Sequence, residues 1–170
     1  MEFLKRKTLR LNEYDYSQNG AYFITVCTYK KRHLFGEIEN CQIAYNNAGQ
    51  MVKRHLEYIN NYDDVFLDKY VIMPNHVHAI IVVNHTDTTQ RSYPTLSEYI
   101  RRFKMMTTKL YIDSVKSGEY PPFEKAIWQK SFYDHVIRDE NEYLRVWKYI
   151  HDNPLKWDTD EYYTTRREGS

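Results

Sequence analysis

The amino-acid sequence predicts an α+β fold in a single domain, which is the simplest organisation for a chain of 170 residues. Two observations carry this prediction. Segments rich in β-branched and aromatic residues alternate with segments in which apolar residues recur at every third or fourth position. The order of the segments is β, (β), α, β, β, α, β, α. Without the short strand in parentheses, the first six elements have the split βαβ, or ferredoxin-like, order, and one more helix follows them.

The first third of the chain contains one clear strand and one helix. Residues 21–29 (AYFITVCTY) are rich in β-branched and aromatic side chains and predict a strand, and residues 42–45 predict a short edge strand. Residues 47–58 have the apolar spacing of a helix, with Asn46 or Asn47 as its N-cap.

The middle of the chain predicts two apolar strands and a long helix. The strands cover residues 65–72 and 76–83, with Met73-Pro74-Asn75 between them as a hairpin or bend. Proline lacks an N–H group, so it fits the start of the second strand or a bulge. After a polar loop, residues 95–114 repeat apolar side chains at three and four and predict a helix.

The last third predicts one strand and one helix. Residues 116–124 form a loop with Gly and Pro, and a strand is expected around residues 132–137. A final helix covers residues 141–153 and ends at Pro154. Residues 158–170 are expected to be a mobile tail.

The composition is that of a soluble globular protein, with 42% hydrophobic and 28% charged residues. A net charge of +1 is too small to indicate nucleic-acid binding by itself. Tyrosine is abundant, at 17 residues, and such rings suit base stacking and ordinary sheet packing equally well. The basic residues are grouped, which fits a phosphate-binding face or simply solvated helix faces.

The two cysteines, Cys27 and Cys41, form no metal-binding spacing and no disulfide framework. The longest clearly apolar run, residues 79–83, is far too short to span a bilayer. Because no signal-peptide core is evident at the N-terminus, a reducing cytoplasm is expected.

The strongest chemical signal is a pair of histidines on a predicted strand. Side chains alternate faces along a strand, so His76 and His78 project from the same face while Val77 points toward a core. Two imidazoles so placed can converge on one metal ion or one phosphate. A His-hydrophobe-His triplet also fits the alternative of one hydrogen-bonded and one solvated imidazole.

The last predicted helix carries a second candidate pair. Tyr149 and Asn153 are four residues apart and therefore share one face of that helix. A tyrosine hydroxyl and an amide oxygen facing the histidine pair would make a compact site for a metal and a nucleophile. A packing role for Tyr149 on an amphipathic helix is the alternative.

Five segments, taken together, resemble the motifs of one protein family. They are YFITVCTYKKRHLFG (22–36), MPNHVHAIIV (73–82), EYIRRFKMMTTK (98–109), WQKSFYDHVIRDENEY (128–143) and KYIHDNP (148–154). The sequence is similar to the REP-associated tyrosine transposases, a branch of the single-tyrosine (IS200-like) transposases in the HUH endonuclease superfamily. The triplet alone is unspecific, whereas several motifs in the family's order are specific.

The resemblance implies an antiparallel ferredoxin-like sheet with the HUH motif on a central strand and the tyrosine on the added C-terminal helix. It implies that His76, His78 and Asn153 hold a divalent metal, Mg²⁺ or Mn²⁺, and that Tyr149 is the nucleophile. By ligand type alone, imidazoles would favour softer metals such as Zn²⁺. His135 lies in one of the motifs and is expected to be structural.

DNA contacts are expected from a basic arm formed by residues 1–20, from the helix over residues 95–114 and from a Trp-Gln motif whose role is structural or DNA-facing. The candidates are Lys5, Arg6, Lys7, Arg10, Arg101, Arg102, Lys104, Trp128 and Gln129.

The expected function is that of a metal-dependent single-strand DNA endonuclease and strand transferase acting through a 5′-phosphotyrosine intermediate. The expected partner is single-stranded or hairpin DNA of the REP palindrome type, bound by a monomer or a homodimer. Two alternatives stay open: a noncatalytic ferredoxin-like module that binds single-stranded nucleic acid, and a metal-dependent hydrolase that uses water.

Overall fold

The computed structural model describes residues 18–85 and 93–165. Four strands, β1 (Gly20–Cys27), β4 (Val65–Met73), β5 (His76–Val83) and β6 (Tyr133–Ile137), form one sheet in the order β4-β5-β1-β6. Every neighbouring pair in this sheet is antiparallel. The order and direction of the strands are those of a ferredoxin-like sheet, so the predicted α+β fold class is confirmed.

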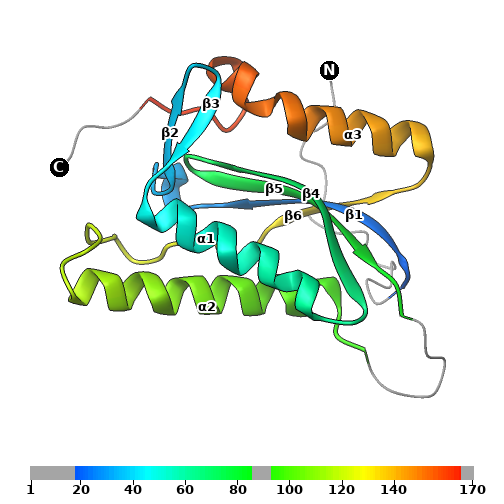
Figure 1. Ribbon diagram of the computed structural model, residues 1–170, viewed down its shortest axis with the longest axis horizontal. Coiled ribbons are helices and arrows are strands. Elements are labelled where there is room, and N and C mark those ends of the chain that lie inside the picture. Colours follow the sequence, from blue (N-terminus) through cyan, green and yellow to red (C-terminus); the bar gives the residue numbers. More distant parts are fainter. Residues whose placement is uncertain (1–17, 86–92, 166–170) are drawn as a thin grey trace.

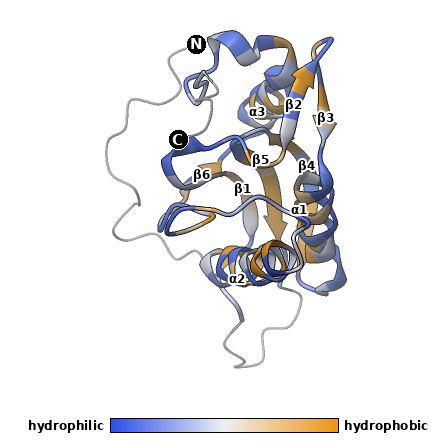
Figure 2. Cartoon of the chain, turned by 90° about the vertical axis from the view of Figure 1, so that its left-hand side faces the viewer, coloured by the Kyte–Doolittle hydropathy of each residue, from blue (hydrophilic) through white to orange (hydrophobic). Residues whose placement is uncertain are grey.

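Helices cover both faces of the sheet (Figure 1). Helices α1 (Asn47–Glu57) and α2 (Leu96–Lys116) pack on one face, and α3 (Glu140–Asp152) packs on the other. Apolar colouring is strong on the sheet strands that lie between these helices (Figure 2). Among the described residues, no helix combines the length and the apolar character that a membrane span requires.

The alternation of side chains along β1 divides the core in two. Tyr22, Ile24 and Val26 point toward α1 and α2, whereas Phe23 points toward α3. The same alternation on β5 sends Val77 toward α1 and α2. Residues of even number on β5 therefore face α3, and both histidines belong to this set.

The predicted edge strand exists, but its partner was not predicted. Strand β3 (Gln42–Tyr45) pairs with β2 (Gly36–Glu39) in a separate two-stranded sheet. The four residues of β2 are half polar and give no clear periodicity. Gly36 is required at its start, because its φ of 138° lies outside the range of other residues and a Cβ would approach the Ala44 carbonyl oxygen to 2.2 Å.

Side-chain caps set where each helix starts. The Asn46 side chain accepts a hydrogen bond from the Gly49 N–H at 2.9 Å, so Asn46, rather than Asn47, is the N-cap of α1. Thr95 and Glu98 form a capping box, which places Thr95 before α2 instead of inside it. Short 3₁₀ helices η1 (Tyr29–Lys31), η2 (Tyr58–Asn61) and η3 (Asn153–Thr159) follow β1, α1 and α3.

Two residues expected to contact DNA also make contacts that hold the fold together. The Lys104 ammonium on α2 donates to the carbonyl oxygens of Gln129 at 2.9 Å and Ser131 at 3.0 Å. Trp128 is buried, and its indole N–H donates to the Thr107 hydroxyl at 2.9 Å. Of the two roles left open for the Trp-Gln motif, the structure supports the structural one for Trp128.

Replacing Lys104 with methionine should lower the free energy of unfolding by about 1–3 kcal/mol, because the change leaves carbonyl groups without their charged donor. The matched control is Lys109→Met, an exposed lysine on the same helix that should change stability by under about 0.5 kcal/mol. Urea denaturation measures both values. Equal stabilities of the two variants would contradict this structural role.

Candidate functional site

The two histidines lie side by side on a central strand. Their ring centroids are 4.4 Å apart, and both side chains are fully buried on the α3 face of β5. The prediction that His76 and His78 share one face is confirmed by the register of β5 against β1. A pair of adjacent, buried imidazoles is a costly arrangement unless their nitrogen atoms have partners.

The hydrogen bonds around His76 fix its tautomer. Its Nδ1 lies 2.7 Å from the Oδ1 atom of Asn75. The Asn75 amide nitrogen donates to the backbone carbonyls of Tyr162 and Lys31, so its oxygen is the atom that faces the imidazole. An amide oxygen only accepts, and Nδ1 of His76 must therefore carry the proton. The lone pair of His76 is on Nε2.

The His78 ring is held by contacts with β1. Its Nδ1 lies 2.8 Å from the Thr25 hydroxyl, and a hydrogen bond to the Ile24 backbone raises its pKa slightly. Burial has the larger effect and lowers the pKa of His78 to about 3. Burial also holds the pKa of His76 well below its usual value, with the neighbouring His78 adding to this effect. Both imidazoles are therefore neutral at physiological pH, the form that binds a metal.

Tyr149 reaches this pair from α3. Its hydroxyl lies 3.3 Å from Nε2 of His78, and its ring packs edge-on against Phe23 with centroids 5.9 Å apart. Burial raises the pKa of Tyr149, and the nearby Asp160 and Tyr162 raise it further. The phenol is thus protonated at neutral pH, and a cation at the site would favour its ionised form.

Asn153 lies one turn beyond Tyr149 and brings an oxygen atom to the site. Its side chain is buried, and its amide nitrogen donates to the carboxylate of Asp160 at 2.7 Å. The amide oxygen of Asn153 and Nε2 of His76 are both buried, and neither completes a hydrogen bond of good geometry within the described part of the chain. The Asn153 side chain also opposes the lowering of the His76 pKa. Two unpaired acceptor atoms in one buried place suit a cation.

Asp160 is the residue of the site that the sequence did not reveal. One ligand atom from each of His76, His78 and Asp160 lies within 4.8 Å of the others. Asp160 falls in an acidic run that was assigned to a mobile tail, and no sequence spacing links it to the histidines. The role of Asn75 in orienting His76 was also missed, although it directly precedes His76 in the motif.

The segment after α3 covers the histidine pair. The Tyr162 ring lies 4.7 Å from the His76 ring, and the Lys31 ammonium lies 5.0 Å from the centre of the Tyr162 ring. Lys31 also donates to the Glu161 carbonyl at 3.0 Å. The structure therefore places part of the expected tail against the site, while residues 166–170 lie outside the described residues.

The remaining predicted DNA contacts do not cluster in one place. Arg101 and Arg102 are on α2, which covers the opposite face of the sheet. Gln129 pairs through its backbone N–H with the Cys27 carbonyl at 2.9 Å. His135 contacts Glu142 at 2.6 Å on β6 and α3, in keeping with the structural role expected for it.

The basic arm residues Lys5, Arg6, Lys7 and Arg10 lie outside the described residues. Their contact with DNA stays a prediction.

Comparison with known families assigns the chain to one of them. The family described as "Transposase IS200 like" matches residues 16–153, which is well over half of the sequence. The chain belongs to the IS200-like transposase family. The resemblance deduced from the sequence motifs is thereby confirmed, and the family places this IS200-like transposase among DNA-processing enzymes.

Individual relatives are similar to this chain over most of its length. The transposase is 36% identical over 174 residues to an uncharacterized protein of Haemophilus influenzae, with 93% of each chain covered. It is 24% identical over 144 residues to a putative REP-associated tyrosine transposase of the same organism, covering 84% of this chain and 74% of the relative. A solved REP-associated tyrosine transposase bound to a REP hairpin matches the fold with a TM-score of 0.56 and 24% identity, over 86% of this chain and 74% of the other.

Proposed function

We propose that this transposase is a metal-dependent single-strand DNA endonuclease and strand transferase in which Tyr149 is the nucleophile. The observation that carries the proposal is the position of the Tyr149 hydroxyl, 3.3 Å from Nε2 of His78. A tyrosine that merely packs in a helix would not need to place its hydroxyl beside a buried pair of neutral imidazoles. Tyrosine can form covalent intermediates when a base or a cation assists it.

The residues at this site fit a divalent cation. Nε2 of His76 and the Asn153 oxygen are buried and complete no hydrogen bond of good geometry within the described residues, and Nε2 of His78 lies beside the Tyr149 hydroxyl. We assign His76, His78 and Asn153 as ligands and add Asp160 as a further oxygen ligand. The carboxylate favours Mg²⁺ or Mn²⁺, whereas the imidazoles also accept softer metals. When bound, the cation supplies polarisation of the scissile phosphate and a lower pKa for a nearby phenol.

The chemistry balances without an external energy source. The Tyr149 oxygen attacks phosphorus, a new P–O bond forms, and the bond from phosphorus to the 3′-oxygen of the preceding nucleotide breaks. The phenolic proton leaves to solvent, and the departing 3′-oxygen takes a proton. One phosphodiester is exchanged for a 5′-phosphotyrosine link, so a second 3′-hydroxyl can reverse the step and join a new strand.

The DNA substrate is proposed to be a hairpin of the REP palindrome type, as the solved relative is bound to a REP hairpin. Near the site, Lys31 lies beside the ring of Tyr162, which covers His76, and we include it as a candidate contact to the backbone of a DNA strand. Phosphate contacts of this kind position DNA and do not read its sequence. The choice between a monomer and a homodimer, and the cytoplasmic location, stay predictions.

The test is incubation of the full chain with an end-labelled REP-type hairpin oligonucleotide and Mn²⁺, followed by a denaturing gel. A labelled band that migrates with the protein supports the proposal. Cleavage without such a band would identify a hydrolase that uses water. Binding without cleavage would favour the noncatalytic module. The fold already weakens that last alternative, because helices cover both faces of the sheet on which strand aromatics would stack bases (Figure 1).

The choice of the oxygen ligand is tested by two substitutions. Asp160→Asn should raise the Mn²⁺ concentration needed for half-maximal cleavage by at least about tenfold, because a charged oxygen is replaced by a neutral one. Asn153→Ala should have a milder effect, since water can fill a vacated position on a hard cation. A metal titration of cleavage measures both.

A larger loss in Asn153→Ala would make Asn153 the main oxygen ligand. Faster cleavage by Asp160→Asn would contradict a ligand role for Asp160 and would mean that its segment obstructs the site.

A further inference from the structure

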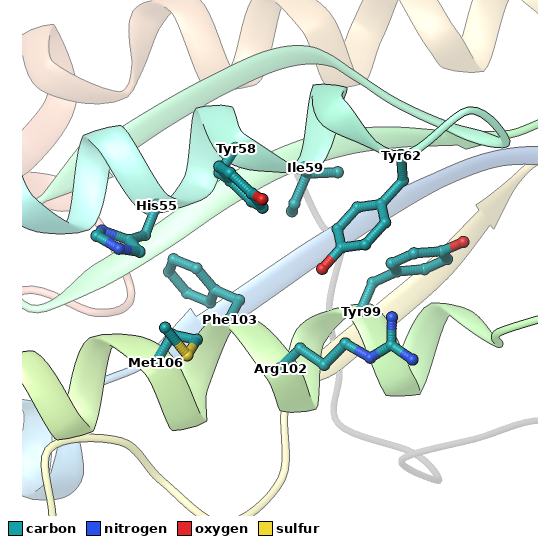
Figure 3. Close-up of a pocket in the computed structure, with 8 residues that line it drawn as sticks. All are labelled: His55, Tyr58, Ile59, Tyr62, Tyr99, Arg102, Phe103 and Met106. Atoms are coloured by element: carbon teal, nitrogen blue, oxygen red, sulfur yellow. The ribbon is translucent and has the colours of Figure 1, made fainter.

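A pocket of about 440 Å³ lies between α1 and α2, on the sheet face opposite the histidine pair. The residues that line it come from α1, from the 3₁₀ helix η2 and the residue after it, and from α2 (Figure 3). They are His55, Tyr58, Ile59, Tyr62, Tyr99, Arg102, Phe103 and Met106. No residue of the proposed catalytic site belongs to this set, so the pocket requires its own explanation.

The pocket is a slot walled by aromatic rings. Ile59, Tyr99 and Phe103 are buried and form its inner surface. The rings of Tyr58 and Tyr62 come from the α1 side and face α2 across the gap (Figure 3). The Tyr62 ring lies 5.1 Å from the Tyr99 ring, centroid to centroid. Such a wall suits a flat aromatic ligand, because rings stack or meet edge-on with favourable geometry.

Arg102 supplies the positive charge in the lining of the slot. The Arg102 guanidinium lies 5.8 Å from the centre of the Tyr62 ring, and none of the eight lining residues is acidic. Two carboxylates lie nearby: Asp64 accepts a hydrogen bond from Tyr99 at 2.7 Å and contacts His85 at 2.9 Å, and Glu98 interacts electrostatically with Arg102. Arg102 is the cation among the lining residues that an anionic group on the ligand could contact, and guanidinium groups bind phosphate strongly.

We propose that this pocket binds one nucleotide, with the base among the tyrosine rings and the phosphate on Arg102. The ligand comes either from an unpaired position of a DNA strand or from a free mononucleotide. The DNA source rests on the proposed function. Since the pocket and Tyr149 are on opposite faces of the sheet, the nucleotide held here is separate from the one that is cleaved.

The methionines provide a direct probe in the full chain. Met106 lines the pocket, Met105 is 57% exposed on the same helix outside it, and Met73 is buried on the face with the histidines. With ¹³C-methyl methionine labels and no metal, titration with dTMP should shift the NMR signal of Met106. The signals of Met105 and Met73 should not move. Thymidine, which lacks phosphate, should bind about tenfold more weakly.

Substitutions distinguish binding in the pocket from a general effect of the positive charge of α2. Arg102→Gln should weaken dTMP binding by about tenfold, whereas Lys109→Gln, which removes an exposed charge from the same helix, should leave it unchanged. Tyr58→Ala removes an exposed wall of the slot and should weaken binding of both dTMP and thymidine. Equal effects of Arg102→Gln and Lys109→Gln would overturn the phosphate assignment.

The source of the nucleotide is identified by comparing dTMP with a single-stranded oligonucleotide and with the same sequence as a duplex. A Met106 shift with the single strand that is stronger than with dTMP assigns the pocket to DNA. If the single strand and dTMP shift the Met106 signal equally per nucleotide, the pocket is assigned to a free nucleotide.

The proposal is wrong if none of these probes moves Met106. It is also wrong if Met106 shifts with rising protein concentration alone, which would show a second copy of the chain in the slot. Because this measurement needs no cleavage, a Met106 shift without any covalent adduct would retain the pocket and reject the catalytic proposal.

Discussion

Replacing Tyr149 with phenylalanine should abolish the covalent protein–DNA adduct and reduce cleavage by at least about a thousandfold, since the variant lacks the oxygen that attacks phosphorus. Hairpin binding should stay nearly unchanged. The fold should be preserved as well, because the ring keeps its contact with Phe23 and the hydrogen bond that the hydroxyl makes to His78 is long, at 3.3 Å. Adduct formation on a denaturing gel and hairpin binding in a gel-shift assay measure the two effects.

The matched control for this variant is Tyr143→Phe. Tyr143 is on the same helix, but its hydroxyl bonds to Asp68 and does not reach the histidines. The hydrogen bond to Asp68, more than burial, raises the pKa of Tyr143 to about 12. Tyr143 is therefore a poor nucleophile unless a base or a cation assists it. An adduct that survives Tyr149→Phe and disappears in Tyr143→Phe would move the nucleophile to Tyr143.

The fold was largely predictable because its strands carry strong local signals. Simple alternation predicts which residues of β5 share the face toward α3. Apolar spacing and capping residues such as Asn46 and Thr95 predict the helices. The β2–β3 pair was only half predicted. Its four-residue strands contain too few apolar positions to show a period, and their pairing depends on Gly36 at the turn into the strand.

The candidate site was predicted where its residues share one element and missed where they do not. His76 and His78 are linked by a period of two, and Tyr149 and Asn153 by a period of four. Asp160 meets them only because the chain turns back after Pro154 and η3, and no local pattern encodes that return. The same limit applies to Lys104. Its charge predicted a DNA contact, and the sequence did not reveal that backbone carbonyls accept hydrogen bonds from its ammonium.

Replacing His76 or His78 with alanine should eliminate metal-dependent cleavage, again by at least about a thousandfold, because each change removes a proposed ligand. The metal response of stability gives an independent readout. A ligand at a hundred times its dissociation constant stabilises a folded protein by about 2.7 kcal/mol, and the variants should lose this gain with Mn²⁺. The control is His135→Ala, which removes a partly exposed histidine bonded to Glu142 and should keep the response.

The metal-free stability of the His76 variant distinguishes a functional histidine from a core histidine. His76 buries an Nε2 atom without a partner, which costs about 1–3 kcal/mol, so its loss should partly offset the packing lost in His76→Ala. His76→Gln retains more volume and should unfold at nearly the wild-type temperature while still lacking the Mn²⁺ response. A large fall in melting temperature with an unchanged response to Mn²⁺ would mean that the imidazole serves the core. The stability of this fold would then depend on the residue that the proposed chemistry needs as a ligand.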